Sequence, residues 1–171
     1  MLATPCGCVP CSTWVDLYLL RHGIAVERIN GRDHPSRGLT MKGRSRTLRV
    51  VKALAVAGFQ ADQAISSPYL RAMETAWLAH RGGLAPPPVP CARLQPGGPG
   101  MDRLADIAGT LLLVGHEPDL GRLASLLIGA PVGAIRLRKA GFCHLRWAAG
   151  EEALAGRASL ERLVSPGVLL R

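Results

Sequence analysis

The chain has 171 residues, of which 48% are hydrophobic, and its 21 Lys and Arg against 12 Asp and Glu give a formal net charge of +9. This length predicts one domain that buries a stable core without disulfides or a metal, and the hydrophobic share excludes a disordered chain. No hydrophobic run approaches the roughly 20 residues that span a bilayer, and the first residues lack a secretory signal, so we expect a soluble, cytoplasmic protein without a membrane partner.

The first 13 residues contain turn formers and no periodic pattern. We interpret residues 1–13 as a loose leader, followed by one domain over residues 14–171. Cys6, Cys8 and Cys11 could be read as soft metal ligands, but no Cys or His pair follows at zinc-finger spacing. We therefore expect neither a metal nor a cofactor.

The first predicted strand is the hydrophobic run Val15–Leu20, which ends abruptly at Arg21, His22 and Gly23. Hydrophobic residues on both faces are typical of a central parallel strand. Gly23 lets the backbone turn without a Cβ clash. The polar residues 24–38, with turn signals at Asn30-Gly31 and His34-Pro35, predict a loop that borders the end of this strand.

Two crossover helices are predicted next, with a short strand between them. Thr40 is the expected N-cap of the first helix, which Gly58 ends, and residues 63–66 form the strand. Ser67-Pro68 predicts an N-cap and a first helical proline for a helix from Pro68 to about His80. Arg71 lies in its first turn, where the helix dipole favours a bound anion.

The remaining chain alternates between loops rich in proline and glycine and short elements. The expected elements are a short strand at 89–92, a brief helix at 101–108, a parallel strand at 110–114 that leads into Gly115-His116, a helix at 118–128, and edge strands at 135–137, 142–147 and 159–164 with at least one antiparallel pair. Together they predict an α/β fold: a single three-layer domain with a mostly parallel central sheet, helices on both faces and an antiparallel edge.

Two of these strands carry a histidine just beyond their carboxyl ends, His22 and His116. Because ligands of open α/β sheets gather at those ends, we expect both histidines at one site together with Arg71. Either histidine alone would more often be a polar cap on a loop. The combination favours an anion-binding site that performs chemistry.

Four blocks of sequence resemble, in order, the histidine phosphatase superfamily. They are Leu20-Arg21-His22-Gly23, Leu39-Thr40-Met41-Lys42-Gly43-Arg44, Ser66-Ser67-Pro68-Tyr69-Leu70-Arg71-Ala72 with Thr75-Ala76, and Val114-Gly115-His116-Glu117-Pro118. The Gly-His-Glu-Pro turn and the short length are similar to the SixA-type phosphohistidine phosphatases. The resemblance runs from about Val15 to the last residue and implies a phosphoglycerate-mutase-like fold.

The resemblance also implies roles for individual residues. His22 would take the phosphoryl group onto a ring nitrogen, while Arg21, Arg71 and His116 would line the phosphate pocket. Guanidinium groups bind phosphoryl oxygens bidentately, and nearby positive charge keeps a histidine neutral and nucleophilic. Gly23 and Glu117, inside the matching blocks, are further candidate substrate-binding residues. So is Arg37, which precedes Gly-Leu-Thr where relatives usually have Arg-Pro-Leu-Thr.

One departure from the superfamily bears on the substrate. Members that cleave phosphate esters commonly use a carboxylate after the second-helix region to protonate the leaving oxygen, but residues 93–98 contain no acid and the next one is Asp102. A phosphohistidine needs no such acid, because its imidazole can be protonated on the other nitrogen before it leaves. This favours a phosphohistidine on a partner protein, such as a phosphotransfer domain, although Glu117 and Asp33 remain candidate donors.

Other functions stay open at this point. A small-molecule phosphomonoesterase would use the same residues. The charge of +9 and the basic run of Lys42, Arg46 and Arg49 at helical spacing could instead bind a polyanion or an acidic protein. With 4% aromatic residues the chain offers few stacking platforms for single-stranded nucleic acid, so we expect no nucleic-acid partner. We expect a monomer.

Overall fold

The computed structural model describes residues 14–28, 30–100, 109–149 and 155–171. It is an α/β domain whose sheet has, within these ranges, six strands in the order β3-β2-β4-β1-β5-β6. Strands β1 (Trp14–Arg21), β2 (Gln63–Ser66), β3 (Val89–Pro90) and β4 (Thr110–Gly115) are parallel. Strands β5 (Phe142–Ala148) and β6 (Ser159–Val164) add the antiparallel edge. The predicted fold class is confirmed.

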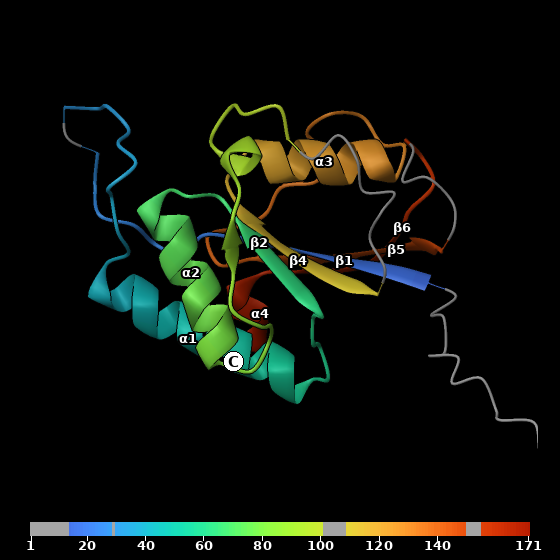
Figure 1. Ribbon diagram of the computed structural model, residues 1–171, viewed down its shortest axis with the longest axis horizontal. Coiled ribbons are helices and arrows are strands. Elements are labelled where there is room, and N and C mark those ends of the chain that lie inside the picture. Colours follow the sequence, from blue (N-terminus) through green and yellow to red (C-terminus); the bar gives the residue numbers. More distant parts are fainter. Residues whose placement is uncertain (1–13, 29, 101–108, 150–154) are drawn as a thin grey trace, which may run out of the picture.

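Helices cover both faces of this sheet (Figure 1). Helices α1 (Met41–Val56) and α2 (Leu70–Arg81) lie together on one face with the short α4 (Pro166–Leu169), and α3 (Asp119–Leu127) lies on the other. Thr40 caps α1 as predicted, because its Oγ1 accepts a hydrogen bond from the N–H of Gly43 at 2.9 Å.

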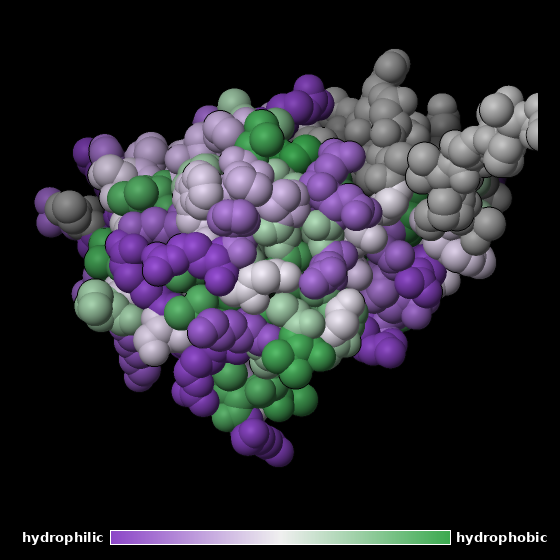
Figure 2. Space-filling view, turned by 60° about the horizontal axis from the view of Figure 1, so that its bottom comes forward, coloured by the Kyte–Doolittle hydropathy of each residue, from purple (hydrophilic) through white to green (hydrophobic). Residues whose placement is uncertain are grey.

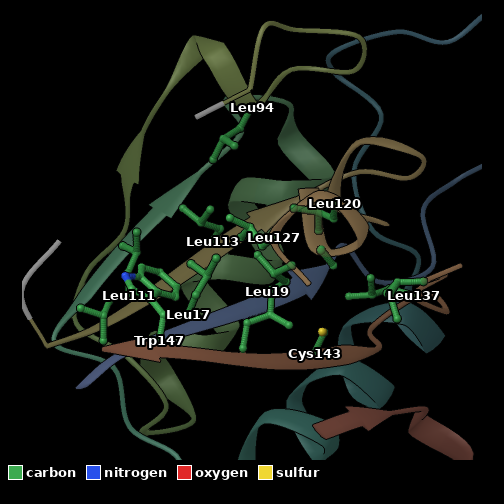
Figure 3. Close-up of a cluster of buried hydrophobic side chains, with 14 residues drawn as sticks. Leu17, Leu19, Leu94, Leu111, Leu113, Leu120, Leu127, Leu137, Cys143 and Trp147 are labelled. Carbon is green, nitrogen blue, oxygen red and sulfur yellow. The ribbon is translucent and has the colours of Figure 1, made fainter. Parts of the chain in front are cut away.

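The alternation of side chains along the central strands divides the core into two layers. Leu111 and Leu113 of β4 pack under α3, whereas Leu112 and Val114 point into the layer beneath α1 and α2. Figure 3 shows the first layer, in which Leu113 lies close to Leu127. Strand β1 alternates in the same way and thereby sends Arg21 toward the α3 side and His22 toward the α1 and α2 side.

Three predicted elements differ from the structure. Helix α2 begins at Leu70, not Pro68, and Ser67 is not its N-cap. Strand β3 covers only Val89–Pro90, and a 3-10 turn, η1 (Ala92–Leu94), takes up the rest of the predicted strand. Residues 135–137 form no strand, because their backbone groups are bonded to side chains: the Ile135 and Leu137 N–H groups donate to Ser125 Oγ and Glu117 Oε1. The leader at 1–13 and the helix expected at 101–108 lie outside the described residues.

Figure 2 views the molecule from the side of α1, α2 and α4. Hydrophilic side chains, in purple, run across much of this face, with hydrophobic ones in green among them. Met41 and Val56, at the two ends of α1, are among the exposed hydrophobic residues. Among the described helices, none combines the length and the hydrophobicity that crossing a membrane would require.

Candidate active site

The carboxyl ends of β1 and β4 and the start of α2 meet at one cleft of about 530 Å³. Because β1 and β4 are neighbours in register, with Arg21 opposite Gly115, the residues that follow them lie side by side. The cleft is lined by Arg21, His22, Ala25, Arg28, Asp33, Arg37, Arg71, Pro96, His116, Glu117, Pro118 and Lys139. The structure thus brings together the four residues that the sequence indicates, Arg21, His22, Arg71 and His116. The first and the last of them, residues 21 and 116, are 95 positions apart in the sequence.

The imidazole of His22 is held in one orientation by its neighbour in the chain. Its Nδ1 lies 2.7 Å from the carbonyl oxygen of Gly23. A carbonyl oxygen only accepts, so Nδ1 carries the proton and donates it, which leaves the lone pair on Nε2. The arrangement therefore fixes the tautomer in which Nε2 is the nucleophilic atom.

His22 is also kept uncharged. It is 8% exposed, and this burial is the main cause that lowers its pKa from 6.5 to about 3, with the positive charges of Arg71 and Arg21 nearby acting in the same direction. The hydrogen bond to Gly23 acts in the opposite direction but is outweighed. The positive charge predicted from the sequence contributes, but burial contributes more.

Gly23 supports His22 through its backbone and through its lack of a side chain. Its N–H donates to Thr75 Oγ1 at 3.0 Å, and its carbonyl accepts from His22, so both backbone groups are engaged inside the protein. A Cβ at this position would lie 2.3 Å from Thr47 Oγ1. Gly23 itself is not among the residues that line the cleft.

His116 lies against His22, with ring centroids 5.1 Å apart. Its Nε2 is 2.8 Å from Ser67 Oγ, and that oxygen already accepts from the N–H of Tyr69, so the hydroxyl proton is available for His116. When the Ser67 hydroxyl donates to Nε2, Nδ1 carries the ring proton, and this buried atom has no partner among the described residues. Burial and the charge of Arg71 lower the pKa of His116 to about 4, so the ring is a neutral donor.

The two arginines approach the cleft from different elements. Arg21, the last residue of β1, donates from Nη1 to the carbonyl of Leu137 at 2.8 Å, while its buried Nε has no partner among the described residues. Arg71, in the first turn of α2, is 3% exposed and stands over the ring of Tyr69, with Cζ 5.0 Å from the centroid. Buried donors without partners mark a place where an anion is bound, because leaving them unpaired costs free energy.

Asp33, a candidate proton donor from the sequence, also lines the cleft. Its carboxylate accepts from Arg71 Nη2 at 2.8 Å and is paired with Arg37. Burial alone would raise its pKa, but the hydrogen bond from Arg37 and the charges of both arginines lower it. Arg37 is further tied to the carbonyl oxygens of Val26 and Glu27, so it braces the loop as well as lining the cleft.

Neither candidate acid in the cleft is set up to donate a proton. The lowered pKa of Asp33 keeps it ionised near neutral pH. Glu117 lines the cleft, and its Oε1 accepts a hydrogen bond from the N–H of Leu137 at 3.0 Å, so this oxygen acts as an acceptor and not as a donor. Within the described residues no group of three or more His, Cys, Asp or Glu side chains could hold a metal ion. Cys6, Cys8 and Cys11 lie outside those residues.

Sequence reasoning missed the residues that hold the others in place. Ser67 orients His116, and Thr75 joins the two halves of the site, since its Oγ1 accepts from Gly23 and donates to the carbonyl of Arg71 at 2.8 Å. The spacing of Arg71 and Thr75, four residues apart on one helix face, was the available signal. For Asp33 the only signal was an acid in the loop after the first strand.

The profile of the histidine phosphatase superfamily (branch 1) matches residues 17–95, a range that holds Arg21, His22, Arg37 and Arg71. An uncharacterized protein of Picosynechococcus sp. is 35% identical to this chain over 164 residues, which cover 91% of this chain and 99% of the relative. The similarity therefore extends well beyond the profile, over the segment that contains His116.

Solved structures with several phosphatase activities share the fold. The protein histidine phosphatase SixA complexed with tungstate superposes with a TM-score of 0.73 at 17% identity, over 90% of this chain and 99% of that one. A putative alpha-ribazole-5'-P phosphatase from Escherichia coli gives 0.64 at 20% identity, over 89% and 97%. At such identities these likenesses establish the fold and do not distinguish between substrates.

Proposed function

The chain belongs to the histidine phosphatase superfamily and is a phosphatase, and we propose that it removes phosphate from a phosphohistidine on a partner protein through a covalent phospho-His22 intermediate. A phosphotransfer domain of the kind that carries phosphohistidine is the proposed partner. The proposal concerns two points: the roles of the residues in the cleft and the nature of the leaving group.

In the first half-reaction the lone pair on Nε2 of His22 forms a bond to phosphorus while the bond from phosphorus to the substrate nitrogen breaks. The electron pair of that bond stays on the leaving imidazole, which departs neutral because its other nitrogen is already protonated. In the second half-reaction water adds to phosphorus, the bond to Nε2 breaks with its electron pair returning to the ring, and a proton passes to solvent.

The observation that carries this proposal is the pair of buried donors without partners beside the nucleophile. Arg21 Nε and His116 Nδ1 both point to an anion that completes their hydrogen bonding. Together with the Arg71 guanidinium they can hold the phosphoryl oxygens in line with His22 and oppose the charge that develops in the transition state. The carboxylate of Asp33 is paired with the guanidinium of Arg71, so a phosphoryl group would compete with that carboxylate for Arg71.

Within the described part of the cleft, neither acid is held as a proton donor, and this supports the choice of leaving group. General acid catalysis is worth about 10² to 10⁴ in rate, and a sugar or alkyl alkoxide depends on it far more than a neutral imidazole does. Asp33 is ionised and Glu117 accepts a backbone hydrogen bond, so neither supplies the proton. A phosphoramidate is therefore the substrate class that this cleft suits best.

The test compares kcat/KM for a phosphohistidine-containing phosphotransfer domain with kcat/KM for a sugar phosphate such as glucose 6-phosphate. We expect the phosphohistidine to be preferred by at least about 10²-fold, the smallest contribution that a missing general acid makes. A preference for the ester would contradict the assigned substrate and favour a small-molecule phosphomonoesterase.

His22→Ala is the control for the chemistry. We expect turnover of both substrates to fall by at least about 10³-fold, because the nucleophile is gone. The circular dichroism spectrum should be unchanged, since this side chain is part of the cleft lining. Near-normal turnover in His22→Ala would show that another group takes the phosphoryl.

A further inference from the structure

The cleft around His22 is part of a longer groove. A hollow of about 760 Å³ and another of about 620 Å³ each share Arg21 with the cleft, and the two hollows share Arg138 with each other. Glu117 and Pro118 join the first hollow to the cleft, and Lys139 joins the second. We call the three together the basic groove.

Positive charge dominates the lining of the basic groove. Of the described residues that line it, nine are cationic and two are acidic; the cations are Arg21, Arg28, Arg37, Arg46, Arg71, Arg122, Arg136, Arg138 and Lys139, and the acids are Asp33 and Glu117. Both acids are already engaged, Asp33 by two arginines and Glu117 by the N–H of Leu137. The field over the groove is therefore strongly positive.

The outer cations are not needed to bind one phosphoryl group. Arg122, Arg136, Arg138 and Lys139 are exposed and form no ion pair with any described residue, and only Lys139 among them lines the cleft that holds His22. Burial is the main cause that lowers the pKa of Arg21; Glu117 opposes it, and the charge of Arg138 adds to the lowering. Such repulsion between neighbouring cations is relieved when an anionic surface covers both.

We propose that the basic groove is the docking surface for an acidic face of the partner protein, one in which carboxylates surround the phosphohistidine. The inference rests on the proposed function and adds the means by which the partner is selected. Carboxylates of the partner would pair with Arg122 and Arg136 in the larger hollow, with Lys139 in the smaller one, and with Arg138, which lines both. Rim charges of this kind act mainly through the association rate.

A protein face fits the groove better than a nucleic acid does. No Phe, Tyr or Trp occurs among the described residues that line it, so unpaired bases would find few stacking platforms. Its uncharged lining instead includes Val132, which is 76% exposed and suits a hydrophobic side chain between the carboxylates of a protein. The reactive His22 also lies at the centre, so the docked surface must present the phosphate there.

The experiment compares two doubly substituted proteins with the same change in net charge. Arg122→Glu/Arg136→Glu reverses charge in the groove, and Lys42→Glu/Arg49→Glu reverses it at exposed positions of α1 that do not line the groove. For each we measure kcat/KM at low and high salt with two substrates, the phosphohistidine-containing phosphotransfer domain and phosphoimidazole.

The groove variant should lose about tenfold in kcat/KM on the protein substrate at low salt, with a weaker salt dependence, and less than about twofold on phosphoimidazole. The α1 variant should match the unsubstituted protein on both. Equal losses in the two variants, or no loss in the groove variant, would overturn the proposal while leaving the phosphatase activity in place. Binding of a duplex DNA oligonucleotide that only the groove variant loses, with the protein rate unchanged, would overturn it in favour of a polyanion.

A separate outcome concerns the proposed function. If the unsubstituted protein removes phosphate from neither phosphohistidine substrate, the assigned reaction is wrong and the acidic partner is withdrawn with it. This result is read from the unsubstituted protein alone, so it cannot be confused with a failure of the groove.

Discussion

At the scale of single residues, His22 and His116 gain their properties from what surrounds their rings. The carbonyl of Gly23 selects the tautomer in which His22 presents a lone pair at Nε2, and a hydrogen bond from the Ser67 hydroxyl to Nε2 of His116 leaves that ring a proton at Nδ1. Burial is the largest cause of both lowered pKa values. Two identical side chains thereby suit the complementary roles proposed for them, one as a nucleophile and one as a hydrogen-bond donor.

We predict that neither histidine titrates between pH 8 and pH 5. With pKa values of about 3 and 4, both rings stay neutral over this range, so nucleophilic His22 remains available throughout. The check is the pH dependence of the ring carbon-bound proton signals in NMR, assigned with His22→Ala and His116→Ala. A midpoint near pH 6.5 for the His22 signals would contradict the account.

The same shifts have a consequence for stability. In the unfolded chain these histidines bind protons below about pH 6.5, whereas the folded protein keeps them neutral. The free energy of unfolding is therefore highest above pH 6.5 and decreases as the pH falls, because protons then bind the unfolded chain preferentially. Each histidine would lower the free energy of unfolding by about 2 kcal/mol at pH 5 relative to its value well above pH 6.5. His116→Gln should show a smaller decrease in that interval.

At the scale of elements, the site depends on how closely α1 approaches the segment that follows β1. Glycines allow this approach: a Cβ on Gly43 would lie 2.0 Å from the carbonyl oxygen of Ile24, and one on Gly23 would meet Thr47 Oγ1. Thr40 strengthens the contact, because its N–H donates to the Ile24 carbonyl at 2.9 Å. The Leu39-Thr40 to Arg44 block of the sequence therefore holds the nucleophile segment in place.

Gly23→Ala should lower the free energy of unfolding by about 1–3 kcal/mol, the usual cost of overpacking. The added methyl group is forced against Thr47 Oγ1, a buried atom without a hydrogen-bond partner among the described residues. Combining it with Thr47→Ala should recover part of the loss. Urea denaturation of the four proteins in this double-mutant cycle measures the effect.

Gly167→Ala is the matched control, because its Cβ would have no neighbour closer than 4.0 Å. If the losses of unfolding free energy from Gly23→Ala and Thr47→Ala simply add in the double variant, the clash with Thr47 is not the cause of the destabilisation.

At the scale of the whole molecule, the fold brings together residues that the chain keeps far apart. Parallel pairing of β1 with β4 places His22 beside His116, and α2 adds Arg71 from between them in sequence. This much could be predicted, because hydrophobic runs that end at a histidine and helices with regular spacing are visible in the sequence. The fold class, both histidines and Arg71 follow from those patterns, whereas the place of Arg21 in the site was implied by the resemblance to the superfamily.

What could not be predicted depends on contacts between distant segments. Helix α2 starts at Leu70, whose N–H donates to the carbonyl of Pro35, a residue of the loop after β1. Ile135 and Leu137 have the composition of a strand, yet Ser125, Glu117 and Arg21 take up their backbone groups. Asp33 pairs at the cleft with Arg71, which is 38 positions further along the chain. These partners are distant in the sequence, so no local pattern indicates them.

The central claim is that the assembled cleft transfers a phosphoryl group to His22. It is tested most directly by mixing the protein with a phosphotransfer domain that carries radiolabelled phosphohistidine, quenching in alkali, where the phosphorus–nitrogen bond survives, and mapping the label on peptide fragments. We predict label on the fragment that contains His22 and none in His22→Ala, while His116→Ala still carries it. Consumption of the substrate with no label on His22, or the same label in His22→Ala, would contradict the account.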